Sequence, residues 1–169
     1  MTAANHPTND ASVAARTLVM ERIFDAPREL VFKAYTDPKH LEQWFGPRGW
    51  TTTVYALDLR PDGIWHYCMR SADGEESWGK GIYREIVPPE RIAYLDIFSD
   101  KDGNSVEGMP QMEIVVEFHE QDGKTKLISR TVFATPDELK AVIDMGVEEG
   151  AAETFDRLEE FLAQERGSA

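Results

Sequence analysis

The chain has 169 residues, 41% of them hydrophobic, and a formal net charge of −13 at pH 7. This length favours one domain with its own core, and the acidic charge argues against nucleic acid as a partner because phosphate backbones are repelled. No apolar run reaches the roughly 20 residues of a membrane-spanning helix, and a lone cysteine, Cys68, excludes an internal disulfide and fits a reducing, cytoplasmic location.

The N-terminal part of the chain predicts a tail, a strand and two short helices. Residues 1–15 are small and polar, so we expect a disordered tail there. Apolar residues alternate over 16–24 and predict the first strand. Prolines at the start of 28–35 and 38–45 favour two short amphipathic helices, because proline is tolerated in a first helical turn.

The middle of the chain has a period of two and predicts six more strands, separated by turns rich in glycine, proline and aspartate. Their predicted ranges are 51–59, 63–70, 77–87, 91–99, 112–120 and 124–133. The last segment, 135–164, predicts one long helix that begins with the cap Thr135 and Pro136.

These elements predict an α+β fold in which a curved antiparallel sheet of seven strands grips one helix. Only the C-terminal helix is long enough to cover the apolar side of such a sheet. One helix is roughly 10 Å across, whereas seven strands at about 4.8 Å spacing are roughly three times as wide. We therefore expect one domain over 16–165, a C-terminal tail over 166–169, and a concave space that the helix cannot fill alone.

The candidate ligand-binding residues are those that alternation turns toward the helix, together with residues of the second short helix and of the last helix. They are Trp44, Phe45, Trp65, Tyr67, Met69, Tyr83, Tyr94, Asp96, Phe98, Met112, Ile114, Val116, Gly150, Ala151, Thr154 and Phe155. Aromatic rings and methionines suit pockets for varied apolar ligands, so they predict a cavity of roughly several hundred Å³. The alternative is that the same side chains form a solid core.

Two carboxylates could give such a cavity chemistry, and one pair of side chains has the residue types that bind metals. Asp96 and Glu85 face the helix if their strands are regular, whereas a bulge near residues 88–91 would turn one or both outward. An inward carboxylate could orient a ligand or act as a general base. His66 and Cys68 share the opposite face and lack further ligands, so we expect exposed residues, no metal and no cofactor.

Three stretches of the sequence resemble a known family. They are FDAPRELVFKAYTDPKHLEQWFGPRGWT, LRPDGIWHYCMRSADG and GIYREIVPPERIAY. They resemble the START-like (SRPBCC) helix-grip superfamily, and within it the branch similar to the C-terminal domain of the activator of the heat-shock-protein-90 ATPase. The order of motifs agrees over about residues 16–164. That branch usually carries a tryptophan after the glycine of the last helix, where this chain has Gly150-Ala151, and a methyl in place of an indole opens volume.

The first functional hypothesis is therefore a monomeric or weakly dimeric protein that binds a small hydrophobic or aromatic molecule, with no catalytic residue assigned. The resemblance supplies two alternatives, because one fold hosts many functions. One is a module that interacts with a chaperone. The other is an enzyme of the cyclase or hydrolase type that uses Asp96 or Glu85.

Overall fold

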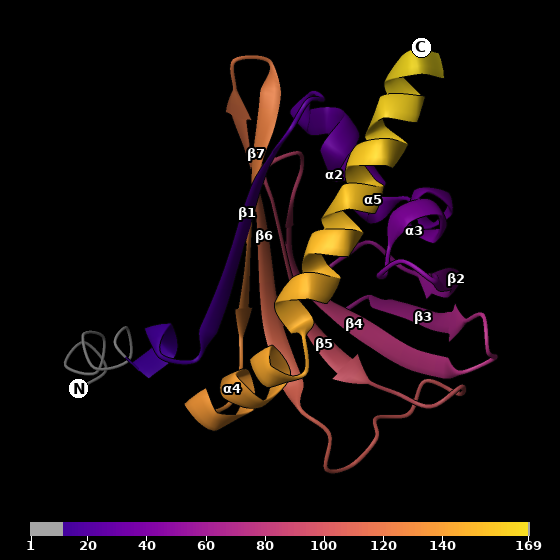
Figure 1. The fold of residues 1–169 in the computed structure, drawn as a ribbon, viewed down its shortest axis with the longest axis vertical. Coiled ribbons are helices and arrows are strands. Elements are labelled where there is room, and N and C mark those ends of the chain that lie inside the picture. The colour runs from indigo at the N-terminus through magenta and orange to yellow at the C-terminus, as the bar shows by residue number, and fades with distance from the viewer. Residues whose placement is uncertain (1–11, 169) are drawn as a thin grey trace.

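The computed structural model describes residues 12–168, in which one long helix lies across a seven-stranded sheet (Figure 1). The strands are β1 (Thr17–Phe24), β2 (Trp50–Leu57), β3 (Ile64–Ser71), β4 (Glu76–Val87), β5 (Arg91–Phe98), β6 (Gln111–Gln121) and β7 (Lys124–Val132). Their order in the sheet is β1-β7-β6-β5-β4-β3-β2, and all neighbours are antiparallel. The predicted α+β helix-grip fold is confirmed.

Four helices complete this part of the chain. They are α2 (Arg28–Thr36), α3 (Pro38–Trp44), α4 (Pro136–Asp144) and α5 (Val147–Ser168). The predicted start signals act as caps: the Asp37 carboxylate accepts from the backbone of Lys39 at 2.9 Å, and the Thr135 hydroxyl accepts from the backbone of Glu138 at 3.1 Å.

The prediction of a single C-terminal helix from residue 135 was wrong. The helix is interrupted after α4, where Gly146 has a φ of +92°. This left-handed conformation is open to glycine and strained for other residues, so Gly146 ends one helix and lets the chain turn into the next. In Figure 1, α4 lies at one end of the sheet and α5 runs across its face.

The predicted tails at the two ends of the chain are described only in part. Residues 1–11 of the expected disordered tail fall outside the described residues, while 12–14 form one helical turn before β1. At the other end, α5 continues to Ser168, beyond the expected domain end at 165. Within residues 12–168, no helix is long and apolar enough to cross a membrane.

The packed core lies between the sheet, α2, α3 and the C-terminal half of α5. Phe24, Phe118 and Leu127 from the sheet meet Leu158 and Leu162 of α5 in one cluster of buried side chains. The C-terminal half of α5 is therefore fixed by ordinary apolar burial, at about 25 cal/mol per Å².

Two arginines also attach α5 to its surroundings. Arg22 of β1 donates to the carboxylate of Asp156 at 2.7 Å. Arg157, the next residue of the helix, donates to the backbone carbonyls of Gly46 and Pro47 in the loop that follows α3, and to that of Trp50 at the start of β2. The helix is thus held on one flank to strand β1 and on the other to that loop.

Candidate ligand-binding cavity

A cavity of about 380 Å³ lies between the concave face of the sheet and the first turns of α5. Its wall combines side chains from the strands with residues of α2, α3 and the following loop. The lining residues are Leu18, Met20, Tyr35, Trp44, Phe45, Gly46, Pro47, Tyr67, Met69, Tyr94, Asp96, Met112, Ile114, Val116, Ser129, Thr131, Phe133, Val147, Gly150, Ala151, Thr154 and Phe155. Aromatic and apolar side chains dominate this wall, as they do in small-molecule sites.

The hollow part of the sheet's concave side lies under the small residues of α5. Gly150 and Ala151 both line the cavity. A Cβ atom placed on Gly150 would meet no heavy atom within 4 Å apart from the helix's own nearby backbone. Further along α5, Leu158 and Leu162 are fully buried against the sheet. The helix therefore fills the space with its C-terminal half and leaves it open at its N-terminal half.

Most of the predicted site residues line this cavity. Those in its wall are Trp44, Phe45, Tyr67, Met69, Tyr94, Asp96, Met112, Ile114, Val116, Gly150, Ala151, Thr154 and Phe155. Trp65 and Tyr83 are outside the wall and are buried in the packed core. Phe98 lines a separate cavity of about 120 Å³, to which Tyr67 and Asp96 also contribute. Alternation predicts the face on which a side chain lies, and position along the strand decides whether it reaches the cavity.

The wall also contains residues that the sequence did not single out. They are Leu18, Met20, Tyr35, Gly46, Pro47, Ser129, Thr131, Phe133 and Val147. The pairs Leu18–Thr131 and Met20–Ser129 lie side by side in the register of β1 with β7. The alternation of Leu18 and Met20 was a usable signal, but only the pairing of the first strand with the last brings them beneath α5.

Asp96 is the only acidic side chain among the described residues that line the cavity. The hydroxyl of Tyr67 donates a hydrogen bond to its Oδ1 at 3.2 Å. Burial raises the pKa of Asp96 to about 6, and the hydrogen bond from Tyr67 opposes that rise. Burial also raises the pKa of Tyr67 well above its ordinary range, so its hydroxyl remains a donor. At neutral pH the cavity therefore contains a mainly ionised carboxylate with one hydrogen-bond donor.

Glu85 does not join Asp96 in the cavity. The register of β4 with β5 shifts between Tyr83 and Glu85, a bulge that turns the Glu85 side chain outward. There it is exposed and pairs with Arg91. The outward alternative is thus the observed one for Glu85, while Asp96, on a regular part of β5, faces inward.

The prediction that His66 and Cys68 are both exposed was wrong, because the His66 side chain is half-buried and the thiol is buried. Cys68 is fully buried, and burial raises its pKa. The His66 ring lies 5.2 Å from the Trp78 ring, and its Nε2 is 3.2 Å from the backbone oxygen of Asp100. Residues 12–168 contain no group of three or more side chains arranged to hold a metal ion.

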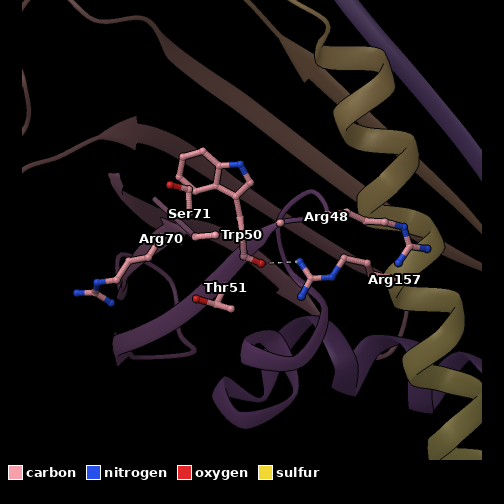
Figure 2. Close-up of a pocket in the computed structure, with 8 residues that line it drawn as sticks. Arg48, Trp50, Thr51, Arg70, Ser71 and Arg157 are labelled. Carbon is pink, nitrogen blue, oxygen red and sulfur yellow. Dashed lines mark hydrogen bonds between the residues drawn. The ribbon is translucent and has the colours of Figure 1, made fainter. Parts of the chain in front are cut away.

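A second, more polar cleft of about 440 Å³ lies between α5 and strands β2 and β3. Figure 2 shows Arg157 reaching from α5 to the backbone of Trp50, while Arg70 points away from the other two guanidinium groups. Arg48 pairs with Glu160 at 2.6 Å, and Arg70 pairs with Glu76 at 3.0 Å.

The arginines of this cleft are occupied by the protein itself. Arg157 donates to the carbonyls of Gly46, Pro47 and Trp50 at 2.8 to 3.2 Å. Burial and the nearby charge of Arg48 lower the pKa of Arg157. Because Gly46 and Pro47 also line the cavity, Arg157 fixes one part of the cavity wall to α5.

Comparisons with known proteins agree with this fold. The family model described as activator of Hsp90 ATPase homolog 1-like protein matches residues 25–163. A solution structure from Staphylococcus epidermidis is 35% identical with a TM-score of 0.81, over 89% of this chain and 91% of that chain. No curated protein matches the chain.

Crystal structures of two other bacterial proteins are similar. The one from Mycobacterium smegmatis is 33% identical with a TM-score of 0.80, over 89% of this chain and 92% of that chain. The one from Nitrosomonas europaea is 28% identical with a TM-score of 0.80, over 91% of this chain and 98% of that chain. The predicted resemblance is confirmed, and the chain belongs to the activator of Hsp90 ATPase homolog 1-like family, with the START-like (SRPBCC) fold.

Proposed function

We propose that this protein binds a small apolar or aromatic molecule in the cavity under the first turns of α5. The cavity itself is the observation that supports this most, because its 380 Å³ are enclosed largely by aromatic, aliphatic and methionine side chains. This volume lies within the roughly 300 to 1,000 Å³ typical of small-molecule sites. Burial of the ligand's apolar surface provides the affinity, at about 25 cal/mol per Å².

In this proposal the ligand enters beside the loop that follows α3. Phe45, Gly46 and Pro47 of that loop are part of the cavity wall. The loop is held to α5 by the bonds from Arg157 to backbone carbonyls, so entry at this point requires those bonds to loosen. We place the protein in the cytoplasm, where its buried free thiol, Cys68, stays reduced.

The test is binding of N-phenylnaphthylamine, a neutral apolar fluorophore, to the full chain and to two tryptophan variants. Ala151→Trp puts an indole into the cavity wall and is expected to abolish the fluorescence increase. Ala163→Trp adds the same side chain on the exposed side of α5 and is expected to bind like the parent.

Both negative outcomes of this experiment are informative. If the parent chain does not bind the fluorophore, nor a panel of apolar molecules followed by native mass spectrometry, the proposal is wrong. If Ala151→Trp binds as well as Ala163→Trp while both are folded by circular dichroism, the ligand sits somewhere other than the cavity.

A chaperone-binding module is the second candidate function, and family membership is the observation that favours it. The expected result under this alternative is that the chain raises the ATPase rate of a purified chaperone of the Hsp90 type. The cavity variant Ala151→Trp separates the two functions, since filling the cavity removes ligand binding and leaves the outer surfaces of the protein unchanged.

Fewer residues than expected support a cyclase or hydrolase reaction. The sequence suggested two inward carboxylates, but Glu85 lies outside the cavity and pairs with Arg91. Acid–base chemistry in the cavity would therefore depend on Asp96 with Tyr67 as its neighbour. We propose that Asp96 binds a ligand and does not act as a general base.

A further inference from the structure

The carboxylate of Asp96 is underused as a hydrogen-bond acceptor. An ionised carboxylate has about four lone-pair sites for donors. The hydroxyl of Tyr67, 3.2 Å from Oδ1, is the hydrogen-bond donor that the structure provides. Asp96 lines both the main cavity and the smaller one beside it, so its remaining acceptor sites adjoin open space. A donor group on a bound molecule can occupy them.

Asp96 also lacks a counter-ion in the cavity. None of the described lining residues is a lysine, arginine or histidine. The residues around it are Tyr67 of β3, Gly81 of β4, Met112 of β6 and, on its own strand β5, Tyr94. None of these carries a positive charge, and a buried carboxylate without a cation costs free energy that a cationic ligand would recover.

The rest of the wall suits a cation as well. The rings of Tyr35, Trp44, Phe45, Tyr94 and Phe155 line the cavity together with Tyr67. Aromatic faces attract ammonium groups within about 6 Å through the ring quadrupole. The net charge of −13 adds a long-range attraction for cations and a repulsion of anions.

We infer that the cavity selects molecules with an apolar body and one protonated amine, which pairs with the carboxylate of Asp96. This inference rests on the proposed function and specifies its ligand class. A carboxylate-bearing ligand such as a fatty acid is excluded, because it would bring a second negative charge beside Asp96 without a cation to balance the pair. Neutral molecules bind through burial of apolar surface alone.

The test compares three probes that share a naphthalene ring and differ in their polar group: naphthylmethylamine, naphthylmethanol and naphthoate. Their affinities for the full chain are measured by calorimetry at about pH 8, where Asp96 is ionised and the amine is still mainly protonated. We expect the amine to bind about tenfold or more tightly than the alcohol, since an opposite charge at close range is worth at least one pKa unit. Naphthoate is expected to bind more weakly than the alcohol.

Asp96→Asn keeps the shape of the side chain and removes its charge. In this variant the preference for amine over alcohol is expected to fall to within about threefold, with alcohol binding retained as evidence of folding. The matched control is Glu85→Gln, which removes a carboxylate from neighbouring strand β4 on the outer face and is expected to keep the preference. The preference of the parent is also expected to shrink toward about pH 5, where Asp96 is mainly protonated.

The outcomes separate the inference from the function on which it rests. If the alcohol binds and the amine binds no better, or if Asp96→Asn keeps the full preference, amine selection by Asp96 is wrong and apolar binding stands. If none of the three probes binds at either pH, amine selection is wrong, and the proposed function is overturned as well when the parent also fails to bind N-phenylnaphthylamine and the apolar panel.

Discussion

The hydroxyl of Tyr67 reaches over strand β4 to donate its hydrogen bond to Asp96 on strand β5. Tyr67 lies opposite Gly79 in the register of β3 with β4. A Cβ atom on Gly79 would come within 2.6 Å of both Cζ and Oη of Tyr67. The absence of a side chain at Gly79 is therefore what allows the ring to lie flat on the sheet and meet the carboxylate.

Replacement of Gly79 by alanine is expected to displace the Tyr67 ring. Since the new methyl collides with the ring and pushes its hydroxyl away from Asp96, we expect a loss of about 1 to 3 kcal/mol in the free energy of unfolding. Urea denaturation of Gly79→Ala and the parent measures this loss. Equal stability of the two proteins would show that the ring has room to move aside.

The same substitution at Gly150 is expected to have the opposite sign. Gly150 lies within α5, and a Cβ there meets open space in the cavity. Alanine in place of glycine inside a helix stabilises by about 0.5 to 1 kcal/mol. Thermal unfolding of Gly150→Ala should show a raised Tm, and a lowered one would mean that the cavity wall closes on this position.

The pH dependence of stability is expected to report the burial of Asp96. Its pKa rises from an ordinary value of 3.8 to about 6 on folding, so between these values the native state binds the proton more tightly than the unfolded state. Stability is therefore lost as the pH rises from about 4 to about 6, by about 2 to 3 kcal/mol in total.

Asp96→Asn cannot ionise and isolates this contribution. The variant is expected to gain stability relative to the parent as the pH rises through that window, and the difference is expected to be constant above about pH 7. Urea midpoints at several pH values measure it. A difference that stays constant from about pH 4 to about pH 8 would mean that Asp96 titrates alike in both states.

Two arginines at the polar cleft are expected to differ in their effect on stability. Arg157→Ala leaves the carbonyls of Gly46, Pro47 and Trp50 without this donor and is expected to cost about 1 to 3 kcal/mol. Arg48→Ala removes an exposed ion pair with Glu160 and is expected to change stability much less, because water screens exposed charges. Denaturation of both variants side by side tests this order, and a reversed order contradicts the role of Arg157 in holding the loop.

Local sequence signals were sufficient for most of the fold. Strand alternation and the caps at Asp37 and Thr135 act through neighbouring residues, so they can be recognised without the tertiary structure. The break at Gly146 was missed because a glycine in an amphipathic segment is compatible with two roles, close packing inside a helix or a left-handed end of one.

Only part of the candidate site could be predicted, because some of its residues depend on how the strands pair. Alternation identified the concave face of the sheet. Ala151, which stands where similar proteins usually carry a tryptophan, indicated where the space is open. Ser129 and Thr131 could not be found, because they reach the cavity only through the pairing of β7 with β1. The outward turn of Glu85 depends on a bulge whose exact place the sequence does not specify.

The division of α5 into an end over open space and an end in the apolar core has an evolutionary consequence. The residues that shape the cavity, such as Gly150 and Ala151, occupy different turns from Leu158 and Leu162, which anchor the helix. Under the proposed binding role, exchanges at the first pair change the space open to a ligand, while the second pair keeps α5 attached to the sheet. Relatives that differ only at the first pair are then expected to keep this fold while their cavities differ in shape.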